Sequence, residues 1–237
     1  MSFLKLSGRM ERLASKVTKG SRLADVGTDH GYIPISLILR GQIQAAVAMD
    51  IGQGPLERAK KHIQAYGLDT YIKTRLSDGL SELAPGEADT VLIAGMGGAL
   101  TVRILENGGH CLGTVRELIL QPQSEIFKVR AWLCENGFVI TEEDIVLDMG
   151  KYYPIIKAVH GRSLSMSRAE LAYGSAGLQK SPAVLYEYLQ KELAKKKYII
   201  EMLEQNGQRD SVRALELKKE YEIIKTAYAE LKQQRNG

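Results

Sequence analysis

The sequence has little cysteine and no long apolar run, and both absences restrict its class. It holds two cysteines in 237 residues, Cys111 and Cys134, and they form no Cys-x-x-Cys pair. We therefore expect reduced, buried thiols in a cytoplasmic protein, with no disulfide framework and no metal site. No stretch of eighteen apolar residues is present, and residues 1–20 lack the apolar centre of a signal peptide, so no membrane association is expected.

What the sequence does have is a globular composition, with 44% hydrophobic and 25% charged residues. Its length suits one α/β domain and a small appendage. The net charge of +4 is unevenly spread, because residues 1–24 carry six basic side chains and one acidic side chain. Residues 180–237 are also basic, and the middle is mildly acidic. The basic flanks can contact a polyanion, although charge that only maintains solubility explains them equally well.

Short apolar segments alternate with amphipathic segments over the first 160 residues, which indicates a parallel sheet with helices on both faces. Asp148-Met149-Gly150-Lys151 is a hairpin turn sequence, so an antiparallel pair should close the sheet. Strands are expected at residues 22–26, 45–49, 71–75, 90–94, 117–120, 138–147 and 152–159. Helices are expected at residues 4–17, 34–40, 52–66 and 99–106, and from a Ser124 cap to residue 135.

The pattern changes near Ser181, where apolar side chains begin to recur at spacings of three and four. Asn206-Gly207 can end one helix, and Asp210 or Ser211 can start another. This predicts an antiparallel helical hairpin with a seam like that of a coiled coil. The expected division is a main domain at residues 1–162, a linker at 163–180 and the helical hairpin at 181–237.

The loop after the first expected strand has the form Asp25-x-Gly27-x-Asp29-x-Gly31. Its glycines allow a tight turn and a close approach to a ligand. Its carboxylates would repel the pyrophosphate of NAD, which prefers free helix N–H groups. They suit S-adenosylmethionine, which carries a sulfonium and an ammonium. The sign of the charge therefore favours the methyl donor over the dinucleotide.

Two further acidic residues follow the next two expected strands. Asp50 can accept hydrogen bonds from ribose hydroxyls, and Asp78 can accept one from the adenine amine, with Gly79 leaving room for the ring. Taken singly, each feature has an ordinary structural explanation: Asp50 could cap a helix, and Asp78-Gly79 could form a turn. Three acids after three consecutive strands indicate a bound nucleoside cofactor.

The fourth expected strand leads into Ala94-Gly95-Met96-Gly97-Gly98. Glycines here would let a substrate ring approach the transferable methyl group, although a plain strand-to-helix turn needs the same residues. The Asp/Asn-Pro-Pro-aromatic motif of enzymes that methylate exocyclic amines is absent from this position.

The segments ADVGTDHGYIP, IAGMGGAL and LILQPQ, followed by a helical hairpin, resemble the bacterial tRNA (adenine-22, N1)-methyltransferases. The resemblance extends over almost the whole chain. It implies a class I Rossmann-like fold, S-adenosylmethionine as donor and N1 of an adenine in the tRNA D-arm as acceptor. The residues expected to hold the cofactor are then Asp25, Gly27, Thr28, Asp29, His30, Asp50, Asp78, Gly79, Ala94, Gly95 and Met96.

N1 of adenine has an in-plane lone pair, so its methylation needs alignment more than a base. Asp29 could stabilise the developing positive charge, or it could hold the cofactor. His30 could hydrogen-bond the base and Tyr32 could stack on it, although both could be structural. We expect these three residues to be catalytic, and the basic side chains of the first helix, Arg9, Arg12 and Lys16, to hold tRNA phosphates.

Three alternatives stay open at this stage. The chain could methylate another RNA or a small molecule, it could be an NAD-linked oxidoreductase, or it could be a non-enzymatic RNA-binding or assembly protein. The acidic loop disfavours the oxidoreductase, and the basic first helix disfavours a small-molecule substrate. The sequence gives no sign of an obligatory protein partner.

Overall fold

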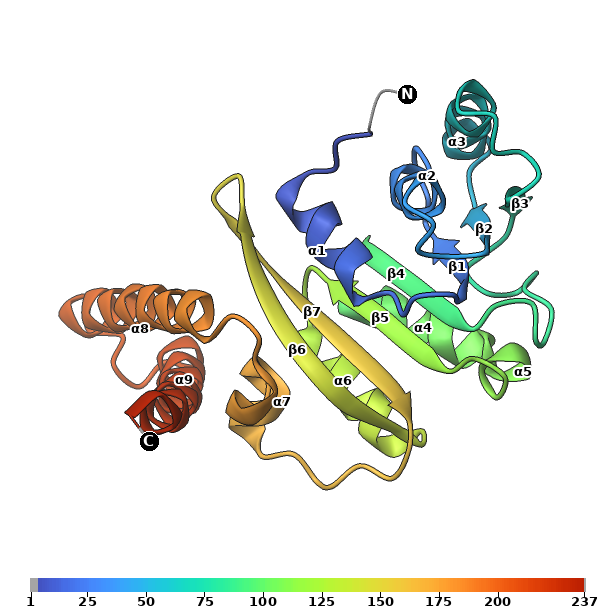
Figure 1. The fold of residues 1–237 in the computed structure, drawn as a ribbon. Coiled ribbons are helices and arrows are strands. Elements are labelled where there is room, and N and C mark those ends of the chain that lie inside the picture. Colours follow the sequence, from blue (N-terminus) through green and yellow to red (C-terminus); the bar gives the residue numbers. More distant parts are fainter. Residues whose placement is uncertain (1–3, 237) are drawn as a thin grey trace.

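The computed structural model describes residues 4–236, and a single seven-stranded sheet forms its centre (Figure 1). The strand order is β3-β2-β1-β4-β5-β7-β6, in which β1 to β5 are parallel and β7 is antiparallel to both of its neighbours. The expected parallel sheet with a closing antiparallel pair is thus confirmed. The strands are β1 (Arg22–Val26), β2 (Ala45–Asp50), β3 (Ile72–Leu76), β4 (Thr90–Met96), β5 (Glu117–Pro122), β6 (Phe138–Asp148) and β7 (Lys151–His160).

Helices cover both faces of the sheet because its strands are apolar on both sides. Leu23 of β1 packs with α1 (Gly8–Lys16), α2 (Tyr32–Leu39) and α3 (Gln53–Ala65). The next residue, Ala24, points the other way, toward α4 (Gly98–Asn107), α5 (Gly109–Leu112) and α6 (Ile126–Glu135). Each strand therefore joins two separate apolar cores.

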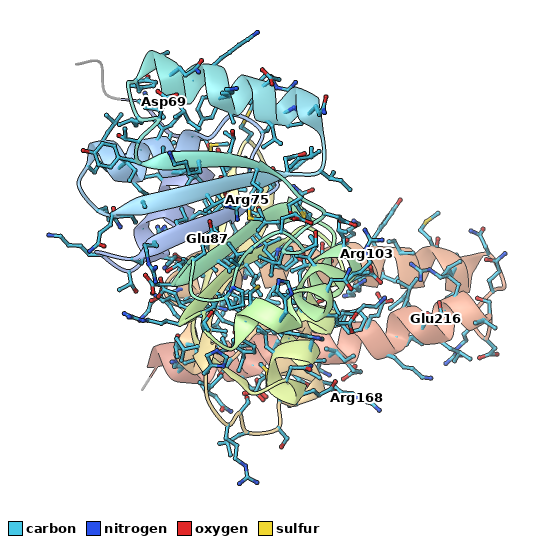
Figure 2. The ribbon with its side chains drawn as sticks, turned by 90° about the vertical axis from the view of Figure 1, so that its right-hand side faces the viewer. Asp69, Arg75, Glu87, Arg103, Arg168 and Glu216 are labelled. Atoms are coloured by element: carbon cyan, nitrogen blue, oxygen red, sulfur yellow. The ribbon has the colours of Figure 1, made fainter. Side chains whose placement is uncertain are left out.

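The strand order reverses between β1 and β4, which places a crevice at their carboxyl ends. The loops after the five parallel strands all lie along this carboxyl edge. At the outer strand β3, Arg75 donates two hydrogen bonds to Glu87, at 2.5 and 2.6 Å, and so ties the strand to the segment before β4 (Figure 2).

The C-terminal segment forms two long helices, α8 (Pro182–Gln205) and α9 (Val212–Asn236), which pack against each other beside β6 (Figure 1). Ile145 of β6 joins the apolar cluster at their base. Asn206 follows the last residue of α8, and the Ser211 hydroxyl accepts a hydrogen bond from the Ala214 N–H. Ser211 thus starts the second helix. None of the helices within residues 4–236 has both the length and the apolar character that a membrane crossing needs.

The segment expected as a linker, residues 163–180, contains α7 (Arg168–Tyr173) and the 3-10 turn η1 (Ala176–Leu178). A buried ion pair holds it against the sheet, because Arg130 of α6 contacts Glu143 of β6 at 2.6 Å. The same arginine donates to the Leu171 carbonyl at 2.9 Å, and Glu143 accepts from the Ser175 N–H at 2.7 Å. The segment is therefore fixed, although the expected boundaries stay a prediction.

One expected cap is wrong. Ser124 does not cap the helix that follows it, since α6 begins two residues later and its cap position is Glu125. The Ser124 carbonyl instead accepts a hydrogen bond from the Gly98 N–H at 2.9 Å, which joins the loops after β4 and β5. At the first helix, Ser7 accepts from the Met10 N–H, so α1 starts later than residue 4.

Candidate functional site

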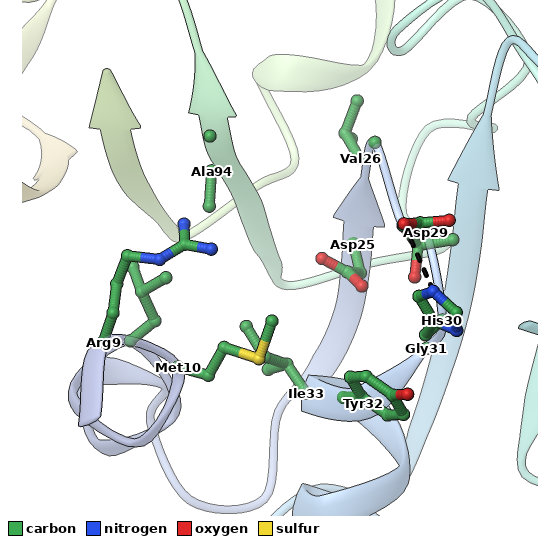
Figure 3. A pocket seen from close by; sticks show the side chains of 14 residues that line it. Arg9, Met10, Asp25, Val26, Asp29, His30, Gly31, Tyr32, Ile33 and Ala94 are labelled. Carbon is green, nitrogen blue, oxygen red and sulfur yellow. Dashed lines mark ion pairs between the residues drawn. The ribbon is translucent and has the colours of Figure 1, made fainter. Parts of the chain in front are cut away.

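An open cavity of ≈ 210 Å³ lies at the carboxyl ends of β1 and β4, between α1 and α2 (Figure 3). Its position is the one that the reversal of strand order creates. Fourteen side chains or backbone segments line it, and they come from these four elements and the loop after β1: Arg9, Met10, Leu13, Asp25, Val26, Gly27, Thr28, Asp29, His30, Gly31, Tyr32, Ile33, Ala94 and Gly95.

The floor of the cavity is the loop after β1. Gly27 has a φ of +79°, which lets the chain turn back without the strain that a side chain would add. The N–H groups of Gly27 and Thr28 both donate to the Met49 carbonyl, at 2.8 and 3.0 Å, so β2 fixes the turn. The Met96 side chain lies directly against Gly27. A larger residue at position 27 would meet this methionine.

Asp25 is the buried anion of the cavity. It lies on the strand face that points to α1 and α2, and burial raises its pKa to about 6. The neighbouring Thr28 hydroxyl lowers the pKa, and the nearby charge of Asp50 raises it. No basic side chain among residues 4–236 forms an ion pair with Asp25. At neutral pH the cavity therefore contains an unpaired carboxylate.

Asp29, His30 and Tyr32 lie together on the side of the cavity away from Arg9 (Figure 3). Asp29 accepts a hydrogen bond from Arg58 Nε at 2.9 Å, and one of its oxygens lies 3.3 Å from His30 Nε2. The rings of His30, Tyr32 and His62 stack on one another, with centroids 5.0 to 5.3 Å apart. The sequence analysis missed Arg58 and His62, although their spacing of four places both on one face of the helix that follows Asp50.

Arg9 reaches into the cavity from α1, as Figure 3 shows. Its Nη1 donates to Gln121 Oε1 at 2.8 Å, and its guanidinium lies 5.1 Å from the centre of the Tyr153 ring. No carboxylate among the described residues pairs with this guanidinium. Gln121 is buried at the end of β5, within the LILQPQ segment. Arg9 is therefore a cavity cation, and Gln121 and Tyr153, which the sequence analysis missed, hold it in place.

The other two expected phosphate ligands point elsewhere. Lys16 is buried, and its ammonium contacts Glu142 and lies 2.7 Å from Asp144, both on β6. Arg12 lies 3.1 Å from the same Asp144. Because Lys16 is enclosed and paired, its position argues against the expected phosphate contact and for a role in holding α1 on the sheet. Arg12 is only partly exposed and is also paired.

The loops after β2 and β3 lie outside the cavity lining. Asp50 ends β2, and its Oδ1 accepts a hydrogen bond from the Gly52 N–H at 2.8 Å, which leaves the second oxygen for another donor. Asp78 is exposed, and Ile104 packs closely on Gly79. Asp50 is near enough to Asp25 to raise its pKa, so this edge continues the site beyond the cavity.

The glycine run 95–98 begins within the last residues of β4, and the end of this strand is irregular. Pairing between β4 and β5 shifts register between Ala94 and Met96, and Gly95 at the shift has a φ of +79°. The bulge brings bare backbone to the cavity, with the Arg9 guanidinium near Gly95. A planar ligand can therefore approach the end of β4 closely. Within residues 4–236 no group of three His, Cys, Asp or Glu side chains could hold a metal ion.

The charges of the site match a zwitterion. Asp25 on β1 and Arg9 on α1 face one cavity, and neither side chain has a partner of opposite charge within residues 4–236. An α-amino acid group carries an ammonium and a carboxylate, so it would satisfy both. S-adenosylmethionine has such a group at one end and a nucleoside at the other. The residues present fit that molecule, with the nucleoside directed toward Asp50 and Asp78.

The comparisons with known proteins all relate this chain to methyltransferases. Residues 6–156 match the family described as "Methyltransferase domain". The chain is 33% identical to the tRNA (adenine(22)-N(1))-methyltransferase of Bacillus subtilis, over 95% of this chain and 98% of that one. A Streptococcus pneumoniae structure in complex with S-adenosyl-L-methionine has a TM-score of 0.83 and 35% identity, over 94% and 100% of the two chains. An M. capricolum structure in complex with S-adenosyl-homocysteine has a TM-score of 0.84 and 25% identity, over 95% and 99%.

Proposed function

This chain belongs to the family of tRNA (adenine(22)-N(1))-methyltransferases, and we propose that it transfers the methyl group of S-adenosylmethionine to N1 of adenine 22 in the D-arm of tRNA. The observation that carries the proposal is the cavity with one unpaired anion and one unpaired cation, Asp25 and Arg9, at the carboxyl edge of the sheet. Similarity to the Bacillus subtilis enzyme over almost the full length of both chains supports the tRNA substrate.

The cofactor would lie across the loop after β1. Asp25 would accept hydrogen bonds from its ammonium, and Arg9 would donate to its carboxylate. The free oxygen of Asp50 would accept from the ribose, and Asp78 would accept from the adenine amine beside Gly79. Met96 contacts Gly27 and would border the reacting end. When bound, S-adenosylmethionine supplies a sulfonium methyl group.

The acceptor adenine would enter along the bulge at Gly95, where the Arg9 guanidinium and the Gln123 amide are the nearest side chains. N1 of neutral adenine carries an in-plane lone pair, so no side chain has to remove a proton from it first. The residues around Gly95 and Arg9 then act by alignment and by exclusion of water. The methylated ring is cationic until its amine loses a proton, so a carboxylate nearby would stabilise it.

Asp29 is the exposed carboxylate of the cavity, and Arg58 already neutralises part of its charge. We propose that it orders His30 and Tyr32 at the cavity wall and contributes a weaker counter-charge to the methylated ring. The ring stack of His30, Tyr32 and His62 presents a planar surface on which a base could lie. His30 and Tyr32 line the cavity (Figure 3), whereas His62 lies outside its lining.

The proposed substrate places the reaction in the cytoplasm, where tRNA is modified. Arg12 is the most exposed of the three basic residues of α1, so it stays a candidate for a phosphate contact. The helical hairpin of α8 and α9 carries further basic side chains and is a second candidate surface for the tRNA.

The test is methyl transfer from labelled S-adenosylmethionine to unmodified tRNA transcripts. A transcript with adenine 22 should become labelled, and a matched transcript with guanine 22 should not. Nucleoside analysis of the product should give 1-methyladenosine. Equal labelling of the two transcripts would refute the position, and labelling of neither, with no binding of S-adenosylmethionine in calorimetry, would refute the proposed reaction.

A further inference from the structure

The β6–β7 hairpin extends well beyond the rest of the sheet. Its last pairing with β5 joins Leu120 to Ile156, whereas β6 and β7 stay paired as far as Asp148 and Lys151. At about 3.3 Å per residue, the part of this hairpin that is not paired with β5 is on the order of 15–20 Å long. We name residues 147–152 the arm tip. Figure 1 shows the hairpin projecting past the N-terminal end of α1.

Contacts from two sides hold the arm tip at the carboxyl edge. On the cavity side, the Arg9 N–H donates to Asp148 Oδ2 at 3.3 Å. On the other side, the Tyr152 hydroxyl donates to Glu187 of α8 at 2.9 Å, and its ring lies 4.9 Å from that of Tyr188. The arm is therefore fixed between the helix that carries the cavity cation and the first helix of the C-terminal hairpin.

The outermost side chain of the arm tip is unusual. Met149 is 97% exposed, the highest value among the large hydrophobic residues of the described chain. Its φ is +48° and Gly150 follows at +79°, which is the backbone of a turn that favours asparagine and glycine. A methionine at this position gains no packing and adopts a backbone conformation that suits it poorly. Residues that break a local rule without a structural gain often serve function.

We propose that Met149 is an apolar wedge that enters the tRNA beside adenine 22 and fills its place in the base stack while the adenine lies in the cavity. This inference depends on the proposed function, since N1 of a paired or stacked adenine is out of reach until the base swings out. Apolar side chains on projecting strands unstack bases in this way in other nucleic-acid complexes. The arm projects from the same edge at which the cavity opens.

The test uses Met149→Asn, because asparagine suits the turn and removes the apolar wedge. The variant should keep the wild-type unfolding midpoint or exceed it, and it should bind S-adenosylmethionine as the wild type does. Its kcat/KM for the adenine 22 transcript should fall at least about tenfold, because no apolar side chain then compensates for the free energy of removing the adenine from the base stack. A transcript whose base opposite adenine 22 is changed to prevent pairing should restore most of the lost activity.

Leu164→Asn is the matched control. Leu164 is also highly exposed, but it follows β7 at the opposite edge of the sheet, so its replacement should leave all of these values unchanged. Full activity of Met149→Asn on the paired transcript would overturn the wedge. A loss that the unpaired transcript does not restore would also overturn it. Failure of the wild-type protein to label either transcript would refute the proposed function and the wedge together.

Discussion

The charge of Asp25 destabilises the folded chain at neutral pH. Burial raises its pKa to about 6, so the folded state binds the proton more tightly than the unfolded state does. At about 1.4 kcal/mol per pKa unit, ionised Asp25 costs up to about 3 kcal/mol at pH 7. This cost is absent below the unfolded pKa and grows as the pH rises toward 6. A carboxylate that weakens the fold while facing a cavity is best explained by the ligand it binds.

Asp25→Asn should therefore stabilise the ligand-free protein and weaken the binding of S-adenosylmethionine. We expect the thermal unfolding midpoint to rise by several degrees, since about 1 kcal/mol corresponds to about 2–4 °C at this size. The dissociation constant should rise about 10- to 100-fold with the loss of a charged hydrogen bond. Scanning and titration calorimetry measure the two effects. Asp89→Asn is the control, because Asp89 pairs with Arg22 outside the cavity, so its loss should lower stability and leave binding intact.

The same pKa sets a pH dependence for cofactor binding. The affinity of the wild type for S-adenosylmethionine should change by less than about twofold between about pH 6.5 and 7.5, because the Asp25 carboxylate, with a pKa of about 6, is mostly ionised over this range. It should fall about tenfold for each pH unit below about 6, as the carboxylate gains a proton. Titration calorimetry across this range measures it. A flat profile in the wild type would contradict the role of Asp25, and Asp25→Asn should show a flat profile.

Sequence patterns predicted that Asp25 lies at the carboxyl edge of the sheet, but they did not indicate what surrounds Arg9. Asp25 follows a recognisable strand, so its place at the carboxyl edge follows from local pattern alone. Arg9 was expected to hold a tRNA phosphate, because nothing near it in sequence reveals that Gln121 and Tyr153 lie beside its guanidinium. Arg58 was missed for the same reason, since its partner Asp29 is a neighbour only in the folded chain.

At the scale of elements, α1 is fixed by charge as much as by apolar packing. The Asp144 side chain is fully buried, and although burial raises its pKa, the hydrogen bond from Lys16 and the charge of Arg12 lower it below the ordinary value. Amphipathic spacing predicted the helix and its apolar face correctly. It could not predict that the basic face would also be partly buried, because the carboxylates of β6 lie more than 120 residues later in the chain.

Asp144→Asn should loosen α1 and thereby disturb the cavity. Removing one partner of a buried charge cluster costs about 3–5 kcal/mol, which urea denaturation would measure at pH 7. The contribution of Asp144 is present above its unfolded pKa and is lost as the pH falls through its lowered folded pKa. The difference from wild type should therefore shrink in acid. Binding of S-adenosylmethionine should also weaken, because α1 carries Arg9.

Glu11→Gln is the matched control for this prediction, since Glu11 lies on the same helix and pairs with Arg40 at the surface. Exposed pairs contribute little, so its unfolding and binding should stay near those of the wild type. If Asp144→Asn were as stable as Glu11→Gln, the charge cluster would not be what fixes α1.

At the scale of the whole molecule, the buried ion pair of Arg130 and Glu143 and one small apolar cluster help to hold the C-terminal helices on the sheet, together with the contact between Tyr152 and Glu187. Arg130 and Glu143 have side chains that are 3% and 1% exposed, and together they bind the backbone of residues 171–175. Heptad-like spacing predicted the two helices and the position of their loop. It gave no sign of the ion pair, because Arg130 and Glu143 belong to segments that look like an ordinary helix and strand.

Glu143→Gln should weaken the attachment of the C-terminal helices and leave the stability of the sheet nearly unchanged. The change leaves the Arg130 guanidinium buried without a counter-charge, which costs about 3–5 kcal/mol. If α7, α8 and α9 open as a unit, their amides should exchange with solvent about 100-fold faster, whereas those of β1 and β4 should change little. Hydrogen-exchange mass spectrometry compares the segments directly, with Glu222→Gln on the exposed face of α9 as control. Equal acceleration throughout the sheet would show instead that the helices and the methyltransferase domain unfold as one cooperative body.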